Sequence, residues 1–370
     1  MRPPAGGSPP HQLVELRPGR PALIRPGELI TSSLSAVSRW TVGATPAGPV
    51  HHLRLTPDVD VLDLAAGLCD RGHPASPNHV FLGQPLLFGG PGSLPAPAAA
   101  VPYEREEPWG VTVGVLDTGL APHPWLSEWY QDEIAETPDS DGDGILDEQA
   151  GHGTFVAGLI LREAPGARLR VLRVLDSHGV SDQATLLRAL ARLGGERIDV
   201  LNLSFGGYTV DDEPPLGLTE ALRAFPAVVA CAGNTSSSRP FWPAALPEVV
   251  AVGALHEEAP AAFSARGPWI DACAQGVELT SSFLEHASFQ GYATWSGTSF
   301  AAAIVSGAVA RLCREMPPAR AARHVLMEGK RVPGLGVAVR LRQKESARTR
   351  GRRPDRSGET HRQAAPRPLG

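Results

Sequence analysis

The sequence predicts an α/β protein built on a mostly parallel sheet that helices cover on both faces. Of its 370 residues, 42% are hydrophobic, which is enough to form a large core. Largely apolar segments typical of buried strands recur at residues 111–116, 169–175, 200–203, 228–231 and 249–252. Helical patterns alternate with them at residues 154–161, 184–193, 218–225 and 299–313. In such sheets the functional groups gather at the carboxyl ends of the strands.

The composition excludes several classes of protein. The 40 Gly and 36 Pro have no fixed period, which rules out collagen and indicates loops or linkers. No run of 18 apolar residues is present, so we expect no membrane span. The four Cys lie far apart, and we expect buried thiols rather than a disulfide framework. The first forty residues hold no apolar core of a secretory signal, so we expect a cytoplasmic protein, with export left open.

We divide the chain into five parts. Residues 1–49 are rich in Pro, Gly and Arg, and we expect them to be poorly ordered. Residues 50–83 predict a small strand–helix–strand module, because one apolar helix face carries Val61, Leu64, Ala65 and Leu68. A Pro/Gly-rich linker at residues 84–106 then leads to the α/β domain at residues 107–340.

The last thirty residues, 341–370, form a basic tail that we expect to be disordered. From Arg340 onward the chain has ten Lys or Arg and three Asp or Glu, whereas the whole chain has a net charge of −5. We expect a solvated extension. Contact with nucleic acid or another acidic surface is the alternative, and we do not expect a nucleic-acid partner.

Three short segments carry residues suited to acyl transfer. Residues 113–119 run from a buried strand into Asp117, residues 151–158 place His152 at the start of an apolar helix, and residues 296–303 place Ser299 at the start of another. A nucleophilic Ser needs a His to take its proton, and that His needs an acceptor to fix its tautomer. Each residue alone is typical of a helix cap or a core position; together, they predict a catalytic set.

In this order, the three segments resemble the subtilisin-like serine peptidases. Residues 228–234 resemble the oxyanion segment of that family, and residues 243–254 resemble the stretch that follows it. The resemblance covers about residues 107–340. It implies a three-layer subtilisin-like fold and a serine endopeptidase that works through an acyl-enzyme and needs no organic cofactor.

The resemblance also implies a role for each group. Ser299 would be the nucleophile, His152 the proton acceptor and donor, and Asp117 the group that orients His152. The side-chain amide of Asn234 would donate to the oxyanion. A dedicated maturation protease for one peptide or protein is one alternative. A catalytically silent peptide-binding module is the other.

A further segment resembles the edge that lines the family's first specificity pocket. An extended polypeptide substrate is expected to pair there by strand addition, at Ser204, Phe205, Gly206 and Gly207. Phe241 stands where the family often has a small residue, which implies a shallow pocket for small or medium side chains. The alternative for the two glycines is a simple turn at the end of a strand.

Residues 139–148 place carboxylates at alternate positions around glycines, a pattern that suits a hard cation such as Ca²⁺. The expected ligands are Asp139, Asp141, Asp143 and Asp147. The twelfth position is Ala150 where an EF-hand needs Glu, so a solvated acidic turn is the alternative.

Residues 50–83 resemble the end of the family's inhibitory prodomain. The resemblance implies that the chain's own N-terminal segment is an intramolecular inhibitor until self-cleavage. A permanent accessory module is the alternative.

Overall fold

The computed structural model describes residues 10–83, 94–126, 130–131 and 135–339. Its largest sheet is parallel from β19 to β8. The strands follow the order β18 (Arg331–Val332), β19 (Gly336–Ala338), β15 (Ala272–Gln275), β13 (Val250–His256), β12 (Val228–Cys231), β11 (Val200–Leu203), β7 (Thr112–Asp117), β9 (Arg168–Arg173) and β8 (Tyr130–Gln131), with β14 (Ala259–Pro260) beside β13.

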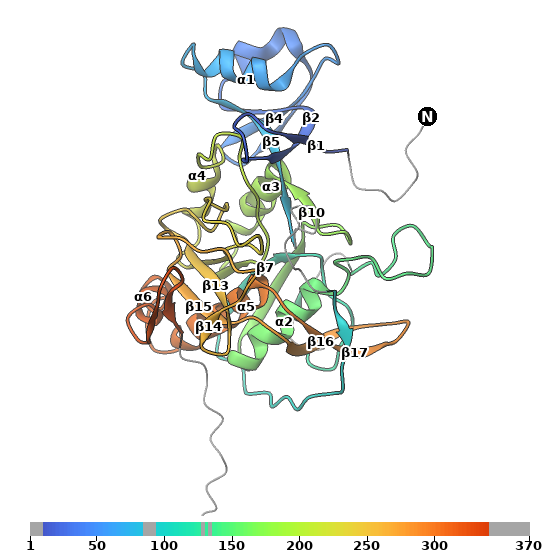
Figure 1. Ribbon diagram of the computed structural model, residues 1–370, viewed down its shortest axis with the longest axis vertical. Helices are drawn as coiled ribbons and strands as arrows, with labels where there is room; N and C mark the ends of the chain where they lie inside the picture. The colour runs from blue at the N-terminus through green and yellow to red at the C-terminus, as the bar shows by residue number, and fades with distance from the viewer. Residues whose placement is uncertain (1–9, 84–93, 127–129, 132–134, 340–370) are drawn as a thin grey trace, which may run out of the picture.

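Helices cover both faces of this sheet (Figure 1). Val113 and Val115 of β7 are buried in one core, which also contains residues of α2 (His152–Glu163), α5 (Thr298–Leu312) and α6 (Pro318–Val325). Leu116 points to the other face and is buried with residues of α3 (Gln183–Leu193) and α4 (Leu218–Leu222). Because successive side chains of a strand point to opposite faces of the sheet, β7 contributes to both cores. The predicted α/β class is confirmed.

The N-terminal residues form a second, antiparallel sheet. Its order is β10 (Val180–Asp182), β5 (Ala75–Leu82), β2 (Ala22–Thr31), β4 (Val50–Leu55) and β3 (Thr41–Ala47), with β1 (Gln12–Val14) beside β2. Figure 1 shows α1 (Val61–Cys69) on the outer face of this sheet and α3 on the inner face. The predicted strand, helix and strand are present as β4, α1 and β5, and the Asp60 carboxylate caps α1 by accepting from Leu62 N and Asp63 N.

The expectation of poor order in residues 1–49 is wrong for residues 12–47, which form β1, β2, the 3₁₀ helix Leu34–Trp40 and β3. The reason lies in β2, where Pro26 and Gly27 split the apolar residues into two runs too short to indicate a strand. The pairing of β2 with β5 is irregular between Ile24 and Leu29, and Gly27 adopts a φ of 68°. One strand therefore continues through the interruption.

A third sheet contains β16 (Leu279–His286), β17 (Phe289–Trp295) and β6 (Ala96–Pro97). Because β6 lies in the predicted linker, residues 94–106 of that linker are partly structured; residues 84–93, like the tail at 341–370, lie outside the described part of the chain. All four cysteines are free thiols, but only Cys231 and Cys273 are buried; Cys313 is half-buried and Cys69 is exposed. Among the described residues, no helix is long and apolar enough to cross a membrane.

The N-terminal sheet is joined to the larger domain by β10, which belongs to that domain but pairs with β5. Arg25 of β2 forms an ion pair with Asp182, with an Nε–Oδ2 distance of 3.1 Å. His79 of β5 is buried at the same junction, where its Nδ1 lies 3.2 Å from Gln183 Oε1. Burial lowers the pKa of His79 to about 4. This junction fixes the end of β5 against the site described next.

Candidate active site

Asp117 and His152 meet at the carboxyl edge of the main sheet. Asp117 is the last residue of β7, and His152 is the first residue of α2. Asp117 Oδ1 lies 2.7 Å from His152 Nδ1, and both side chains are fully buried. The same carboxylate oxygen accepts from the backbone N–H of Thr118 at 2.8 Å. A carboxylate held in this way fixes the imidazole with its proton on Nδ1 and leaves Nε2 as the basic atom.

Ser299 enters the site from the start of α5. Its hydroxyl donates to the carbonyl oxygen of Ser204 at 2.9 Å, just beyond the end of β11. His152 Nε2 is buried and has no hydrogen-bond partner among the described residues. The rings of Trp295 and Phe300 flank the imidazole, with centroids 5.5 and 5.4 Å away. The candidate nucleophile thus has its hydroxyl turned toward Ser204, and the candidate base has a free Nε2 among the described residues.

Asn234 follows β12, next to β11 in the sheet. Its Oδ1 accepts from the backbone N–H of Thr298 at 2.9 Å and from the Thr298 hydroxyl at 2.8 Å. These two bonds fix the amide through its oxygen, so Nδ2 remains the donor. The arrangement can supply a hydrogen bond to negative charge that develops beside Ser299.

The segment that follows β11, residues 204–207, already has a backbone partner on each side. Gly206 and Leu82 exchange two backbone hydrogen bonds, of 2.7 and 3.0 Å, while Gly207 and Trp242 exchange two of 2.9 Å. A Cβ at Gly206 would lie 2.3 Å from the Trp242 carbonyl oxygen, so only glycine fits. Phe205 is fully buried in the core beside α3 and α4; its side chain therefore packs in that core, unlike a group that lines a substrate pocket.

Phe241 lies between this strand and the segment that carries Asn234. Its ring packs against Gly206 and Gly233, and its centroid is 5.4 Å from that of Tyr208. Only 2% of its surface is exposed. The side chain thus fills the space between Gly206 and Gly233.

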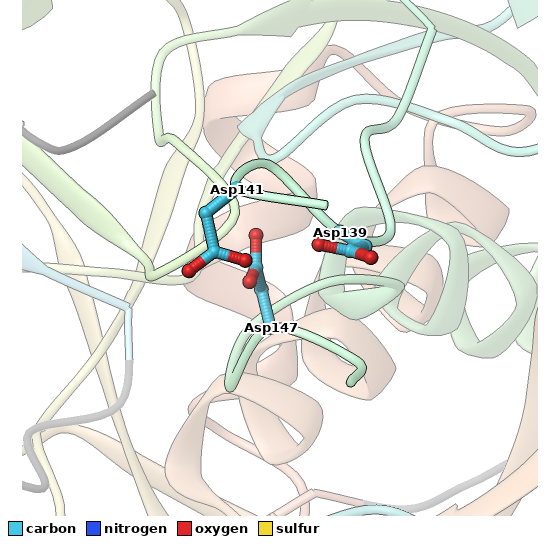
Figure 2. Close-up of side chains that lie close together, drawn as sticks. All are labelled: Asp139, Asp141 and Asp147. Carbon is cyan, nitrogen blue, oxygen red and sulfur yellow. The ribbon is translucent and has the colours of Figure 1, made fainter. Parts of the chain in front are cut away.

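The structure brings three of the four predicted metal ligands together. Asp139, Asp141 and Asp147 each place one carboxylate oxygen within 4.8 Å of the others (Figure 2). Asp143 is outside this group, and its Oδ1 accepts from the backbone N–H of Ile145 at 2.7 Å. Backbone N–H groups, Gly144 first among them, lower the pKa of Asp139, so this carboxyl remains ionised.

One half-buried carboxylate was not among the predicted site residues. Glu136 accepts from Gly151 N at 2.7 Å, from the Thr154 hydroxyl at 2.6 Å and from the Thr118 hydroxyl. Burial raises the pKa of Glu136 to about 7, against the opposing effect of these hydrogen bonds. No pattern in the sequence indicates this residue, because it lies in a polar stretch between the motifs of Asp117 and His152.

Comparisons with known proteins identify relatives of this chain. The sequence profile of the subtilase family, peptidase S8, matches residues 109–337. The chain is 32% identical over 248 residues to the minor extracellular protease Epr of Bacillus subtilis, covering 63% of this chain and 36% of Epr. It is 32% identical over 218 residues to subtilisin Savinase of Lederbergia lenta, covering 56% of this chain and 78% of Savinase.

Two solved structures share the fold. The prenylagaramide maturation protease PagA matches with a TM-score of 0.54 at 24% identity, over 63% of this chain and 92% of that chain. A cold-adapted subtilisin-like serine proteinase matches with a TM-score of 0.53 at 22% identity, over 67% and 94%.

The fold is the α/β fold of subtilisin-like proteases. Because the family profile matches well over half of the chain, the chain belongs to the subtilase family. The predicted family and three-layer fold are thereby confirmed. The chain spans only about a third of the length of Epr.

Proposed function

We propose that this chain is a serine endopeptidase whose catalytic groups are Asp117, His152, Ser299 and Asn234. The observation that carries the proposal is the fully buried 2.7 Å contact between Asp117 and His152, at the edge where Ser299 begins α5. Ser299 Oγ would attack the peptide carbonyl and pass its proton to His152 Nε2, which returns it to the leaving amine. Asn234 Nδ2 would stabilise the oxyanion, and water would release the acyl group.

The hydroxyl of Ser299 now donates to Ser204 O. An extended substrate that pairs with the strand 204–207 would offer its own N–H groups to that strand. Competition for the Ser204 carbonyl would free the hydroxyl to turn toward His152. Substrate pairing would in this way assist activation of the nucleophile.

We propose that the N-terminal segment is an intramolecular inhibitor. The support is its position, because Leu82 pairs with Gly206 and the Gly83 N–H donates to Gly179 O at 2.8 Å. A chain held by backbone hydrogen bonds to the segments at Gly206 and Gly179 has the backbone arrangement expected of a peptide substrate. A permanent accessory module would make the same contacts but would never leave.

We also propose that Asp139, Asp141 and Asp147 hold a structural Ca²⁺ ion. Calcium prefers carboxylate oxygens at 2.3–2.6 Å, so two ligands of one ion lie up to about 5 Å apart. The separation of these oxygens, within 4.8 Å, fits this requirement. The ion would order the loop that leads to His152, and no catalytic step would depend on it. Asp143 is not included.

The first experiment tests the catalytic groups. A fluorophosphonate probe is expected to label the native chain at Ser299, and labelling should vanish in Ser299→Ala and His152→Ala. Asn234→Ala should lower kcat by about 100- to 1,000-fold because one oxyanion donor is lost. The control is Ser306→Ala on the same helix, whose hydroxyl donates to Asn202 and should not affect labelling. Folded protein that never reacts would favour a silent peptide-binding module.

The second experiment tests the pocket. Phe241→Gly should open space beside Gly206 and raise cleavage after Phe or Leu, relative to cleavage after Ala, by about tenfold or more. Cleavage of a mixed peptide library, read by mass spectrometry, measures the change. Tyr208→Phe keeps the neighbouring ring and should leave the preference as it is. An identical preference in Phe241→Gly and native protein would contradict the shallow pocket, and a native enzyme that cleaves one narrow motif would favour a dedicated maturation protease.

The third experiment tests the metal. Calcium at about 100 times its dissociation constant stabilises a folded protein by about 2.7 kcal/mol. For a domain of this size, that corresponds to a Tm increase of roughly 5–10 °C. The increase, measured between chelator and added Ca²⁺, should occur in the native chain and in Asp143→Asn but not in Asp141→Asn. Equal Tm values with and without Ca²⁺ would leave the acidic loop as a solvated turn.

The fourth experiment tests the inhibitor. N-terminal sequencing of purified native protein should give a start between about residues 83 and 107, and peptidase activity should rise as the full-length chain disappears. Ser299→Ala should keep its original start, because self-cleavage needs the nucleophile. Full-length chain that persists in both proteins would argue for a permanent accessory module.

A further inference from the structure

Glu136 connects the two segments that carry Asp117 and His152. Its Oε1 accepts from Gly151 N, directly before His152, and from the hydroxyl of Thr118, directly after Asp117. Its Oε2 accepts from the hydroxyl of Thr154 in the first turn of α2. Three donors from two chain segments thus converge on one carboxylate.

The two hydroxyls extend this network. Thr118 Oγ1 also accepts from Gly153 N at 2.9 Å and lies 3.4 Å from Asp117 Oδ1. Thr154 Oγ1 also accepts from Ala121 N at 2.8 Å. Each hydroxyl therefore bridges the loop after β7 and the start of α2, and each directs its own proton toward Glu136 or Asp117.

We propose that Glu136 is a positioning residue for the catalytic pair, holding Asp117 and His152 in contact and adding negative charge that favours the protonated imidazole. The inference rests on the proposed peptidase mechanism, in which His152 must gain and lose a proton. Glu136 would not touch the substrate. It would act through the Thr118 hydroxyl and the backbone of Gly151.

The charged groups around Glu136 determine how its charge affects the protonation of His152. Asp117 is the nearby carboxylate of β7, His152 begins α2, and Arg173 of β9 donates to Ala135 O and Thr137 Oγ1 on either side of Glu136 in the sequence. Burial and Asp117 raise the pKa of Glu136, which is about 7. Below that pH the carboxyl becomes neutral, and above it the carboxylate favours a positive charge on His152.

Two ionisations should therefore shape the acid side of the rate profile. As the pH falls, Glu136 and His152 both gain protons, so log(kcat/KM) should fall more steeply with pH than a single ionisation allows. The Glu136→Gln variant lacks the ionisation of Glu136, so the slope of its acid limb should approach one. The acid limb should also shift to lower pH by about half a unit or more. The kcat of this variant at pH 8 should fall about tenfold, with little change in KM.

A second readout does not need catalysis. In the full-length chain that carries Ser299→Ala, which prevents self-cleavage, and is labelled with ¹³C at the histidine Cε1 position, the resonance of His152, assigned with His152→Gln, should titrate at lower pH when Glu136→Gln is added. Glu163→Gln removes a negative charge at the far end of α2 and should titrate like the native chain. Glu136→Asp keeps the charge and should stay close to native.

These arms separate the possible failures. The proposal is overturned if folded Glu136→Gln and Glu163→Gln give the same His152 titration. If Glu136→Gln does not fold, Thr154→Val is measured in its place. It removes one hydrogen-bond donor to the Glu136 carboxylate, so the ionisation of Glu136 seen in the His152 titration should move to higher pH. If this ionisation does not move, the proposal is overturned. A native chain that never reacts with fluorophosphonate defeats the peptidase assignment but leaves the titration of His152 to judge Glu136.

Discussion

The hydrogen bond between Asp117 and His152 constrains the rest of the site because it is made where water does not reach. A carboxylate without its partner in such a place would cost several kcal/mol, so the fold must bring both groups together in one arrangement. The parallel order of β7, β11 and β12 does this by ending three strands at the same edge. Asp117 is the last residue of β7, Ser204 directly follows β11, and Asn234 lies three residues after β12. His152 and Ser299 come to the same edge at the starts of α2 and α5.

The sequence predicts the parts of the fold in which local pattern and environment agree. Strands buried on both faces are continuous apolar runs, so β7, β11 and β12 could be located to within a residue or two. The motifs of Asp117, His152 and Ser299 sit at strand ends and helix starts, where position alone indicates proximity. The strand β2 escaped prediction because its apolar residues make sense only when a bulge joins them across Pro26 and Gly27.

Other features of the site are not apparent from the sequence, because they depend on contacts between segments that are distant in the chain. Glu136 is an ordinary acidic residue until the fold surrounds it with donors from Thr118, Gly151 and Thr154. Phe205 lies in a segment that resembles a substrate edge, and its side chain is buried in the core. Asp143 fits the spacing of a metal loop, but its carboxylate lies outside the cluster of Asp139, Asp141 and Asp147.

Strand β5 couples the docking of the N-terminal module to the binding of a peptide at Gly206. It is a central strand of the N-terminal sheet, and its last residue also pairs with Gly206. Any peptide that takes the place of Leu82 must first undo the pairing of that residue, so the docking free energy of the module is subtracted from the peptide's affinity, at tenfold for every 1.4 kcal/mol. Thermodynamic reciprocity then requires that a tightly bound peptide loosen the module by the same amount. Substitutions in the packing of α1 against its sheet, far from the catalytic groups, can thereby change how readily a peptide pairs with Gly206.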